Sequence, residues 1–292
     1  MSRVDVIIVN WNSRHLLARC LASLAGSGAN PIVIDNASND GSEAAAQASG
    51  ATLICNPRNL GFAAACNIGA ARASGDYLLF LNPDATMAAD DLARLVEILR
   101  RAEPEGFGIA GPVLRDERGK EQPSCSEIPR LWDLIGRMIG LDRIGLARPA
   151  LHLPAQSGAV GQVMGAAMLM PRKLFERLGG FDAGYFLYFE DLDLALRARA
   201  LGSRSLFVRE ASAIHEGQGS SKQIKSRRLL LWLRSRHRFT RKNLGRGSAF
   251  LMFLLACLVE PFFRTANLFL SRRIREIPGA LWAHLRFGLS AG

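Results

Sequence analysis

The sequence predicts an α/β protein with a doubly wound, mostly parallel sheet flanked by helices, followed by a basic helical segment. Short apolar runs alternate with segments of helical periodicity over residues 4–101, the pattern of β-α-β units. Tyr77–Leu81 is apolar throughout, which is typical of a strand buried on both faces of a sheet. From Lys222 onward the chain has 15 Lys/Arg and 2 Asp/Glu, whereas the whole chain has a net charge of +11.

The elements of the first half follow from hydrophobic periodicity and turn residues. We expect strands at 4–9, 31–34, 51–55, 77–81 and 107–114, and helices after Ser13, after 40–42, around Asn67 and at 89–101. Ser13 is a residue type that caps helices. Pro83 cannot donate to a ladder, so the strand at 77–81 stops before it and Asp84 lies just past the carboxyl end.

The second half is less regular. Apolar residues recur at helical spacing over 131–146, and we expect a surface helix packed on the domain rather than a cover over an acceptor site. A strand is expected at 162–170, and Pro171 begins a short helix. A further helix is expected from Glu190 to about residue 201, with Asp193 and Arg197 as a surface ion pair four residues apart.

Polar side chains follow four of the expected strands, namely Asn10, Asp35, Asn59 and Asp84. In open α/β sheets the carboxyl ends of the strands form the edge where ligands bind. A carboxylate such as Asp84 suits a hard divalent cation that serves phosphate oxygens, although an ordinary Asn-Pro-Asp turn explains it equally well in isolation. The chain has no GxGxxG after the first strand and no GxxxxGK[ST], which disfavours a dinucleotide-binding dehydrogenase and a P-loop enzyme.

Glu190 and Asp191 open their helix after an aromatic stretch at 185–189 and a glycine pair at 179–180. Acidic residues in a first turn are commonly partners of the helix dipole. The aromatic setting and the glycines, which permit close approach of a ligand, favour a functional role instead.

Composition limits the class of protein. With 49% hydrophobic and 22% charged residues the chain is globular. Its five cysteines form no CxxC pair, which indicates reduced thiols in a cytosolic setting. The first strand is expected from Val4, so we expect no signal peptide before the fold.

The basic segment from residue 222 indicates an anionic partner, either membrane lipid or nucleic acid. Its apolar stretch at 248–259 is shorter than the roughly 20 residues that span a bilayer, and Glu260 and Pro261 interrupt it. We therefore expect an interfacial or re-entrant helical pair on an anionic membrane; a helical cap on the first domain is the alternative. Only Trp232 and Phe239 stand among the charges as stacking aromatics, so we expect no nucleic acid partner.

Five ordered motifs together resemble the family 2 glycosyltransferases, and most closely their rhamnosyltransferase-like branch. They are VIIVNWN at 6–12, IDNAS at 34–38, NLGFAAACNIG at 59–69, GDYLLFLNPDA at 75–85 and GGFDAGYFLYFEDLDLALRARALG at 179–202. The resemblance covers about residues 4–220. It implies a GT-A fold, a nucleotide-sugar donor, a divalent cation (Mg²⁺ or Mn²⁺) and inversion at the anomeric carbon.

The resemblance also assigns roles by position. It implies that Asp191 is the catalytic base beside Glu190, which orients it or holds an acceptor hydroxyl, and that Asp84 and His215 lie at the metal. Asn82 stands at the first position of the family's DxD motif, so the site has one negative charge fewer. The donor-binding residues implied are Asn10, Asp35, Asn36, Asn59, Gly61, Asn67 and Asn82.

The resulting expectation is an inverting, metal-dependent glycosyltransferase of bacterial cell-surface polysaccharide synthesis. Residues 1–220 would form the GT-A domain, with 1–114 binding the nucleotide sugar and 115–220 the acceptor, and 221–292 would associate with the cytoplasmic face of the plasma membrane. By resemblance the donor is dTDP-rhamnose and the acceptor a saccharide or a polyisoprenoid-linked sugar. The alternatives are a catalytically inactive nucleotide-sugar-binding or membrane-bound scaffold homologue, and a sugar nucleotidylyltransferase, whose Gly-rich basic N-terminal loop is missing from 10–15.

Overall fold

The computed structural model describes residues 2–217 and 225–290, which fall into two compact units. The first comprises Met1–Glu127, Leu151–Phe186 and Glu190–Ser220, and the second Ile128–Ala150, Leu187–Phe189 and Ser221–Gly292. The boundary expected at 220/221, the residues after Gly217 in the His215 segment and the start of the basic run at Lys222 lie outside the described residues.

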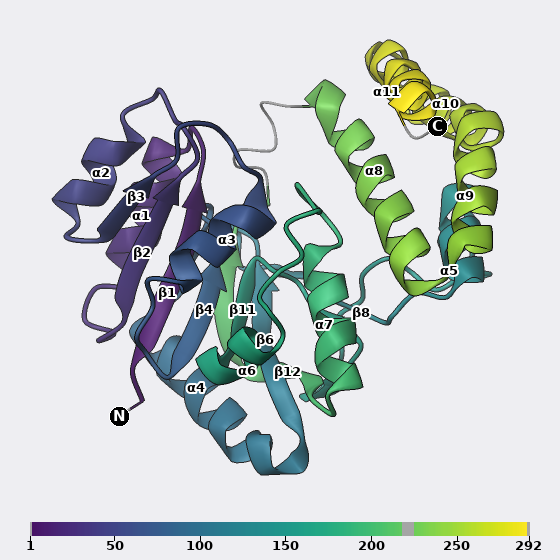
Figure 1. Cartoon of the computed structure of the whole chain (residues 1–292). Coiled ribbons are helices and arrows are strands. Elements are labelled where there is room, and N and C mark those ends of the chain that lie inside the picture. Colours follow the sequence, from purple (N-terminus) through teal and green to yellow (C-terminus); the bar gives the residue numbers. More distant parts are fainter. Residues whose placement is uncertain (1, 218–224, 291–292) are drawn as a thin grey trace. The chain divides into compact units, whose positions relative to one another are not determined.

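The first unit is built on one mixed, mostly parallel sheet, as expected (Figure 1). Its strand order is β3 (Thr52–Cys55), β2 (Asn30–Asp35), β1 (Val4–Asn10), β4 (Tyr77–Leu81), β11 (Ala167–Pro171), β6 (Phe107–Arg115), β12 (Arg204–His215) and β5 (Ala85–Thr86). β1, β2, β3 and β4 pair in parallel, as do β6 and β12, whereas β11 runs antiparallel to β4 and β6. Short strands β7 (Glu121–Gln122) and β9 (Gly158–Val160) extend it, and β8 (Cys125–Ser126) pairs with β10 (Gln162–Val163).

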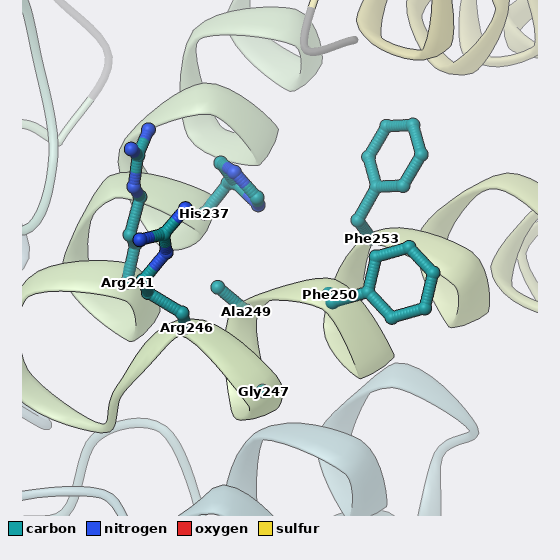
Figure 2. A pocket seen from close by; sticks show the side chains of 7 residues that line it. All are labelled: His237, Arg241, Arg246, Gly247, Ala249, Phe250 and Phe253. Carbon is teal, nitrogen blue, oxygen red and sulfur yellow. The ribbon is translucent and has the colours of Figure 1, made fainter.

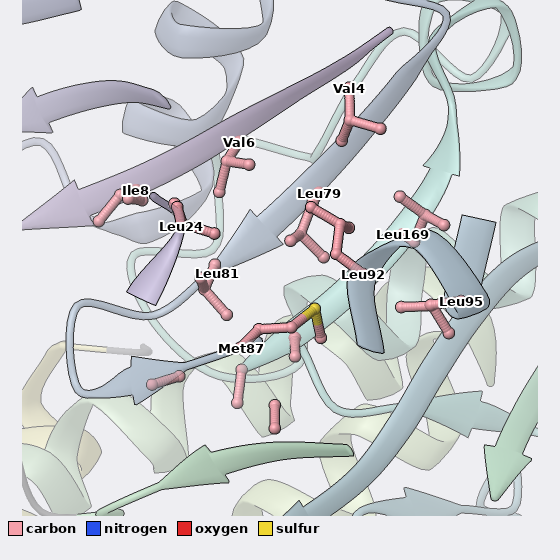
Figure 3. Close-up of a cluster of buried hydrophobic side chains, with 14 of the residues drawn as sticks. Val4, Val6, Ile8, Leu24, Leu79, Leu81, Met87, Leu92, Leu95 and Leu169 are labelled. Atoms are coloured by element: carbon pink, nitrogen blue, oxygen red, sulfur yellow. The ribbon is translucent and has the colours of Figure 1, made fainter. Parts of the chain in front are cut away.

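Helices cover both faces of the sheet, which explains why β4 is apolar at every position. Alternate residues of β4 enter opposite cores: Leu79 and Leu81 one, Leu78 and Phe80 the other. Figure 3 shows part of the first core, whose side chains include Leu79 and Leu81 of β4 and Leu92 and Leu95 of a covering helix. That core includes residues of α1 (Arg14–Ser23), α2 (Ser42–Ala48) and α4 (Ala89–Ala102), and the second core residues of α3 (Phe62–Ala70), α6 (Arg172–Arg177) and α7 (Glu190–Ala200).

Three details differ from the sequence-based expectations. Ser13 stands at the N-terminus of α1, but its hydroxyl donates to the Trp11 carbonyl and makes no capping bond. The strand expected at 162–170 is split into β10 and β11. Asp193 is fully buried rather than on the surface, and it accepts a 2.8 Å hydrogen bond from Arg197 Nε.

The second unit is helical. It contains α5 (Leu131–Met138), α8 (Lys225–Asn243), α9 (Arg246–Leu258), α10 (Glu260–Leu270) and α11 (Ile277–Ser290), with 3₁₀ turns at Leu141–Ile144 and Ile274–Glu276. Leu134 and Met138 of α5 pack in its core together with Leu233, Met252 and Phe287. The helix expected at 131–146 is therefore shorter, and it belongs to this unit's core rather than to the surface of the sheet domain.

Within residues 2–217 and 225–290 no single helix is both long and apolar enough to cross a bilayer. Taken together, α9 and α10 have the length and composition of a span, but the pair is bent by 46° at its junction.

Candidate active site

The ends of β1 and β2 meet in a buried polar network. Asn10 and Asp35 are register partners, and Asn10 Nδ2 donates to Asp35 Oδ1 over 2.9 Å. The Ser38 hydroxyl donates to the same oxygen over 2.6 Å and the Ser38 backbone N–H to Asp35 Oδ2 over 2.8 Å. Asn10 Oδ1 is buried and has no hydrogen-bond partner in the described structure, which leaves an acceptor atom at this edge of the sheet.

The next polar group holds the loop before α3. Asn36 Nδ2 donates to the Gly61 carbonyl over 3.2 Å, and the Gly61 N–H donates to Asn59 Oδ1 over 2.9 Å. Asn56 supports Asn36 with a 2.8 Å bond from its Nδ2 to Asn36 Oδ1. Sequence reasoning missed Asn56, although it directly follows β3 and is closer to that strand's end than Asn59.

Gly61 is required where it stands. Its φ is +84°, and an added Cβ would lie 2.5 Å from the Phe186 carbonyl oxygen. That carbonyl accepts a 2.8 Å hydrogen bond from the Phe62 N–H, so the start of α3 is tied to the aromatic stretch that precedes α7.

Asn67 has a different environment from the other donor-site candidates. Its Nδ2 donates to the Phe181 carbonyl over 2.8 Å, and its Oδ1 accepts from the Phe181 N–H over 2.9 Å. Both ends of the side-chain amide therefore hold the glycine-containing loop at 179–181. Asn67 therefore holds this loop in position and is bonded to it rather than to the polar residues at the strand ends.

Asp84 and His215 lie together at the far end of the same sheet. β5 pairs with β12 so that His215 stands opposite Ala85, and His215 Nε2 is 3.4 Å from Asp84 Oδ1. Their side chains are 9% and 11% exposed. The backbone N–H of Asn82 donates a 2.9 Å hydrogen bond to the Ala166 carbonyl. No cluster of three or more His, Cys, Asp or Glu side chains that could hold a metal occurs in residues 2–217 and 225–290.

The Asp84–His215 pair nonetheless fits a divalent cation. A carboxylate oxygen and an imidazole nitrogen are both ligands of Mn²⁺, and cations that serve phosphates are usually bound by only one or two carboxylates together with substrate oxygens. Two protein donors at the rim of the sheet leave the remaining coordination positions to a diphosphate and water.

Asp191 is held firmly at the first turn of α7. Its Oδ2 accepts hydrogen bonds from Gln162 Nε2 over 2.8 Å and from the Gly165 N–H over 3.0 Å, and its Oδ1 accepts from the Leu192 N–H over 2.8 Å. Gln162 is itself fixed, since its Oε1 accepts from the Ser126 hydroxyl over 2.6 Å. No local pattern indicates Gln162, because it stands in an apolar strand.

Glu190, the residue before Asp191, has different surroundings. It is 6% exposed, and its Oε2 has no hydrogen-bond partner in the part of the chain that the structure describes. Burial raises the pKa of Glu190 well above its usual range, and the charge of Asp191 adds to this shift. Burial also raises the pKa of Asp191, although its hydrogen bonds from Gly165, Leu192 and Gln162 act in the opposite direction. Of the two carboxyls, Glu190 is therefore the one whose surroundings favour the protonated form more strongly.

The backbone before this pair is strained. Tyr188 and Phe189 have φ values of +71° and +68°, a region that aromatic side chains rarely adopt. Asn12 and Ala37, which follow β1 and β2, also have positive φ values, of +49° and +61°. Such strain persists where the surroundings impose it and concentrates at functional sites.

The fold defined by this sheet is that of the GT-A glycosyltransferases. Over 99% of this chain it is similar to a mannosyltransferase from Pyrobaculum calidifontis solved with GDP-Man and Mn²⁺ (TM-score 0.60, 18% identity, 88% of that chain). It is also similar to glucosyl-3-phosphoglycerate synthase from Mycobacterium tuberculosis solved with Mn²⁺ and UDP (TM-score 0.51, 18% identity, 81% of this chain and 77% of the other).

Sequence comparison relates the chain to a family. Residues 5–146, just under half of the chain, match glycosyl transferase family 2, which confirms the expected glycosyltransferase class. Among curated relatives, N-acetylglucosaminyl-diphospho-decaprenol L-rhamnosyltransferase of M. tuberculosis H37Rv is 28% identical over 233 residues, 73% of this chain and 75% of the relative. Rhamnosyltransferase WbbL of Escherichia coli K12 is 31% identical over 170 residues, 57% of this chain and 62% of the relative.

Proposed function

We propose that this protein is an inverting glycosyltransferase that moves rhamnose from dTDP-rhamnose to a polyisoprenoid-diphosphate-linked saccharide in bacterial cell-surface polysaccharide synthesis. The names of the two rhamnosyltransferase relatives support the sugar, and the name of the mycobacterial relative supports the acceptor class. The observation that carries the proposal is Asp191, a carboxylate fixed by Gln162 and Gly165 on the sheet unit that also bears the polar strand ends.

The donor nucleotide would lie along the polar edge of the sheet. Asn10 and Asp35 would contact the base, and the backbone around Asn36, Asn59 and Gly61 would line the nucleotide. The unpaired Asn10 Oδ1 supports this placement, because a buried acceptor without a partner is costly unless a ligand satisfies it. Asn67 would act by holding the loop at 179–181 in place.

Asp84 and His215 would hold the divalent cation, Mg²⁺ or Mn²⁺. When bound there, the cation would neutralise charge that gathers on the leaving diphosphate. Because Asn82 stands where a carboxylate could be, the protein would supply the cation with a single negative charge. The cation would then depend on the diphosphate for much of its binding energy.

The acceptor hydroxyl would lose its proton to Asp191. As the acceptor oxygen bonds to the anomeric carbon, the bond from that carbon to the phosphate oxygen breaks and the diphosphate leaves with the electron pair. A single displacement through an oxocarbenium-like transition state inverts the anomeric centre. General-base assistance of this kind typically contributes about 10²–10⁴-fold. Glu190, whose pKa burial and the charge of Asp191 raise, would in its protonated form donate a hydrogen bond to the acceptor or to Asp191.

A screen of nucleotide-sugar donors by thermal unfolding, with and without Mn²⁺, tests the donor assignment. A donor at 100 times its Kd stabilises a protein by about 2.7 kcal/mol, so dTDP-rhamnose should raise Tm more in Mn²⁺ than in chelator. A donor that binds without any hydrolysis or transfer would favour the inactive nucleotide-sugar-binding homologue. A larger shift with another donor would replace rhamnose in the proposal.

We also propose that the helical unit docks this enzyme on the cytoplasmic face of the plasma membrane as an interfacial or re-entrant pair. Its last three helices expose large apolar side chains to solvent, which soluble surfaces seldom do. They are Phe250, Leu251, Leu254 and Leu258 on α9, Phe262, Phe263, Phe269 and Leu270 on α10, and Leu281, Trp282, Leu285 and Leu289 on α11. Basic residues from 225 onward add attraction to anionic lipid of about 1 kcal/mol each near the surface.

Sedimentation of the full-length protein with phosphatidylglycerol liposomes tests the docking. Phe262 and Leu270 are 74% and 81% exposed, so a Phe262→Ser, Leu270→Ser variant keeps the fold. It should lose about tenfold or more in partitioning, because each buried side chain contributes about 1.5–3 kcal/mol. Leu201→Ser, on the sheet unit, is the matched control. Equal partitioning of all three proteins would exclude this surface.

A further inference from the structure

A pocket of about 540 Å³ lies within the helical unit, between the end of α8 and the start of α9. Its lining consists of His237, Arg241, Arg246, Gly247, Ala249, Phe250 and Phe253. Figure 2 shows the two arginines and the histidine gathered at one side and the rings of Phe250 and Phe253 side by side at the other. The pocket is therefore amphiphilic, with a cationic end and an aromatic end.

Among residues 2–217 and 225–290, no acidic side chain balances the cationic end. α8 contains no Asp or Glu over its 19 residues, and no acidic side chain in the described structure pairs with Arg241 or Arg246. Glu260, a buried acid of this unit, is already bonded to Arg236 and Arg264. His237 Nδ1 is buried without a hydrogen-bond partner among the described residues. Two guanidinium groups next to an unsatisfied imidazole nitrogen match the oxygens of a phosphate group.

The aromatic end continues into the exposed apolar surface of α9. Phe250 is 63% exposed, and Leu251, Leu254 and Leu258 on the same helix are exposed as well. The ring of Phe253 packs against the rings of His237 and Phe287, whose centroids lie 6.1 and 5.6 Å away. A free phosphate ion would leave these rings in water, whereas a hydrocarbon chain attached to the phosphate would cover them.

We infer that this pocket binds the phosphate headgroup of a membrane lipid, with the phosphate on Arg241 and Arg246 beside His237 and the first part of the hydrocarbon chain along Phe250 and Phe253. The site goes beyond the transfer reaction, because none of its residues belongs to the sheet unit. It adds recognition of a particular headgroup to the general attraction of the basic helices for anionic lipid.

Calorimetric titration of the full-length protein in EDTA with soluble amphiphiles tests the inference, the chelator preventing cation-dependent binding elsewhere. The probes are farnesyl diphosphate, dihexanoyl phosphatidic acid, inorganic pyrophosphate and farnesol, each below its micelle concentration. At least one phosphate amphiphile should bind about tenfold or more tightly than pyrophosphate and farnesol, which corresponds to ~1.4 kcal/mol. Tighter binding of farnesyl diphosphate identifies an isoprenoid lipid, and tighter binding of phosphatidic acid a glycerophospholipid.

Exposed side chains supply matched variants that leave the fold intact. Arg241→Gln with Arg246→Gln should lower amphiphile affinity about tenfold or more, whereas Arg272→Gln with Arg275→Gln, which removes the same charge from exposed positions elsewhere in the unit, should change it less than about threefold. Phe250→Ser should weaken the amphiphile and leave pyrophosphate unchanged.

Three results would overturn the inference: pyrophosphate binding as tightly as both amphiphiles, equal losses in the pocket and control variants, or binding of neither amphiphile. Sugar transfer to a water-soluble acceptor should be the same in all three variants. Absence of sugar transfer by the wild-type protein, with its lipid binding intact, would count against the proposed transfer function and leave the pocket assignment standing.

Discussion

Two buried glutamates, each the first residue of a helix, lie in the two units of this molecule and have opposite surroundings. Glu190 opens α7 in the sheet unit and has one oxygen without a partner among the described residues. Glu260 opens α10 in the helical unit and accepts hydrogen bonds from Arg236 over 2.5 Å and Arg264 over 2.7 Å. They are 6% and 1% exposed, so burial alone does not distinguish them.

The difference appears in their protonation. Burial would raise the pKa of both carboxyls, but the charges of Arg236 and Arg264 lower that of Glu260 from its usual range, whereas the charge of Asp191 raises that of Glu190 further. A buried acid with two cationic partners stabilises a core. A buried acid with an acidic neighbour and an unpaired oxygen is typical of a binding or catalytic site, which makes the start of α7 the candidate for the reactive region.

The largest expected effect concerns the metal pair on the sheet unit. Asp84→Ala should reduce transfer by several kcal/mol in activation free energy, about 10³-fold, because the leaving diphosphate loses its cation. Chelator should reduce wild-type activity to a similar level, and Mn²⁺ should restore only the wild type. Activity indifferent to chelator would remove Asp84 and His215 from a metal role.

The two glutamates should respond differently to the same substitution. Glu260→Gln should destabilise the helical unit by about 3–5 kcal/mol, because Arg236 is left buried beside an uncharged group. Glu190→Gln should change unfolding free energy by less than about 0.5 kcal/mol, since the surroundings of Glu190 already favour its neutral form. Chemical denaturation followed by tryptophan fluorescence measures both, because three of the four tryptophans, at 132, 232 and 282, lie in the helical unit. Equal losses would mean that burial, not pairing, governs both sites.

Gln162 is expected to be a positioning residue for Asp191. Gln162→Met keeps the side-chain volume and removes a hydrogen bond to a charged group, worth about 1.5–3 kcal/mol, so kcat should fall about tenfold to a hundredfold with little change in donor KM. Loss of a donor to the carboxylate should also move the acidic limb of the kcat–pH profile upward. A purely structural effect would lower kcat without moving that limb.

The smallest effect is the pH dependence of stability. The raised pKa of Glu190 gives stability that is present below the unfolded value, about 4.3, and is lost as pH rises through the folded pKa. The lowered pKa of Glu260 gives stability that is present above about 4.3 and is lost as pH falls through the folded pKa. Urea titrations across this range should show each slope vanish in the corresponding Gln variant; parallel slopes in the two variants would contradict the assignment.

The fold and the reactive residues differed in how far the sequence could predict them. Tyr77–Leu81 was predicted to the residue, because a strand buried on both faces is apolar throughout. β12 was missed, since a register shift between Val208 and Ser212 lets the charged Arg209 and Glu210 interrupt its apolar pattern.

The candidate site shows the same limit. Asp84 and Asp191 could be proposed from the sequence because strand ends and an acidic first turn carry recognisable patterns. Gln162 and the buried state of Asp193 depend on contacts between distant segments, such as Gln162 with residue 191, which no local pattern encodes. The role of a polar residue in an apolar strand can be inferred only once the structure shows which residues it contacts.

Paired measurements on Asp191→Asn test the central claim most directly. The substitution is nearly isosteric and removes only the basicity of the carboxylate, so calorimetric binding of the nucleotide-sugar donor in Mn²⁺ should be unchanged. Transfer to the lipid-linked acceptor should fall by about 10²–10⁴-fold, the usual contribution of a general base. Near-normal transfer by Asp191→Asn would contradict the account, because the proton of the acceptor hydroxyl would then go to another group.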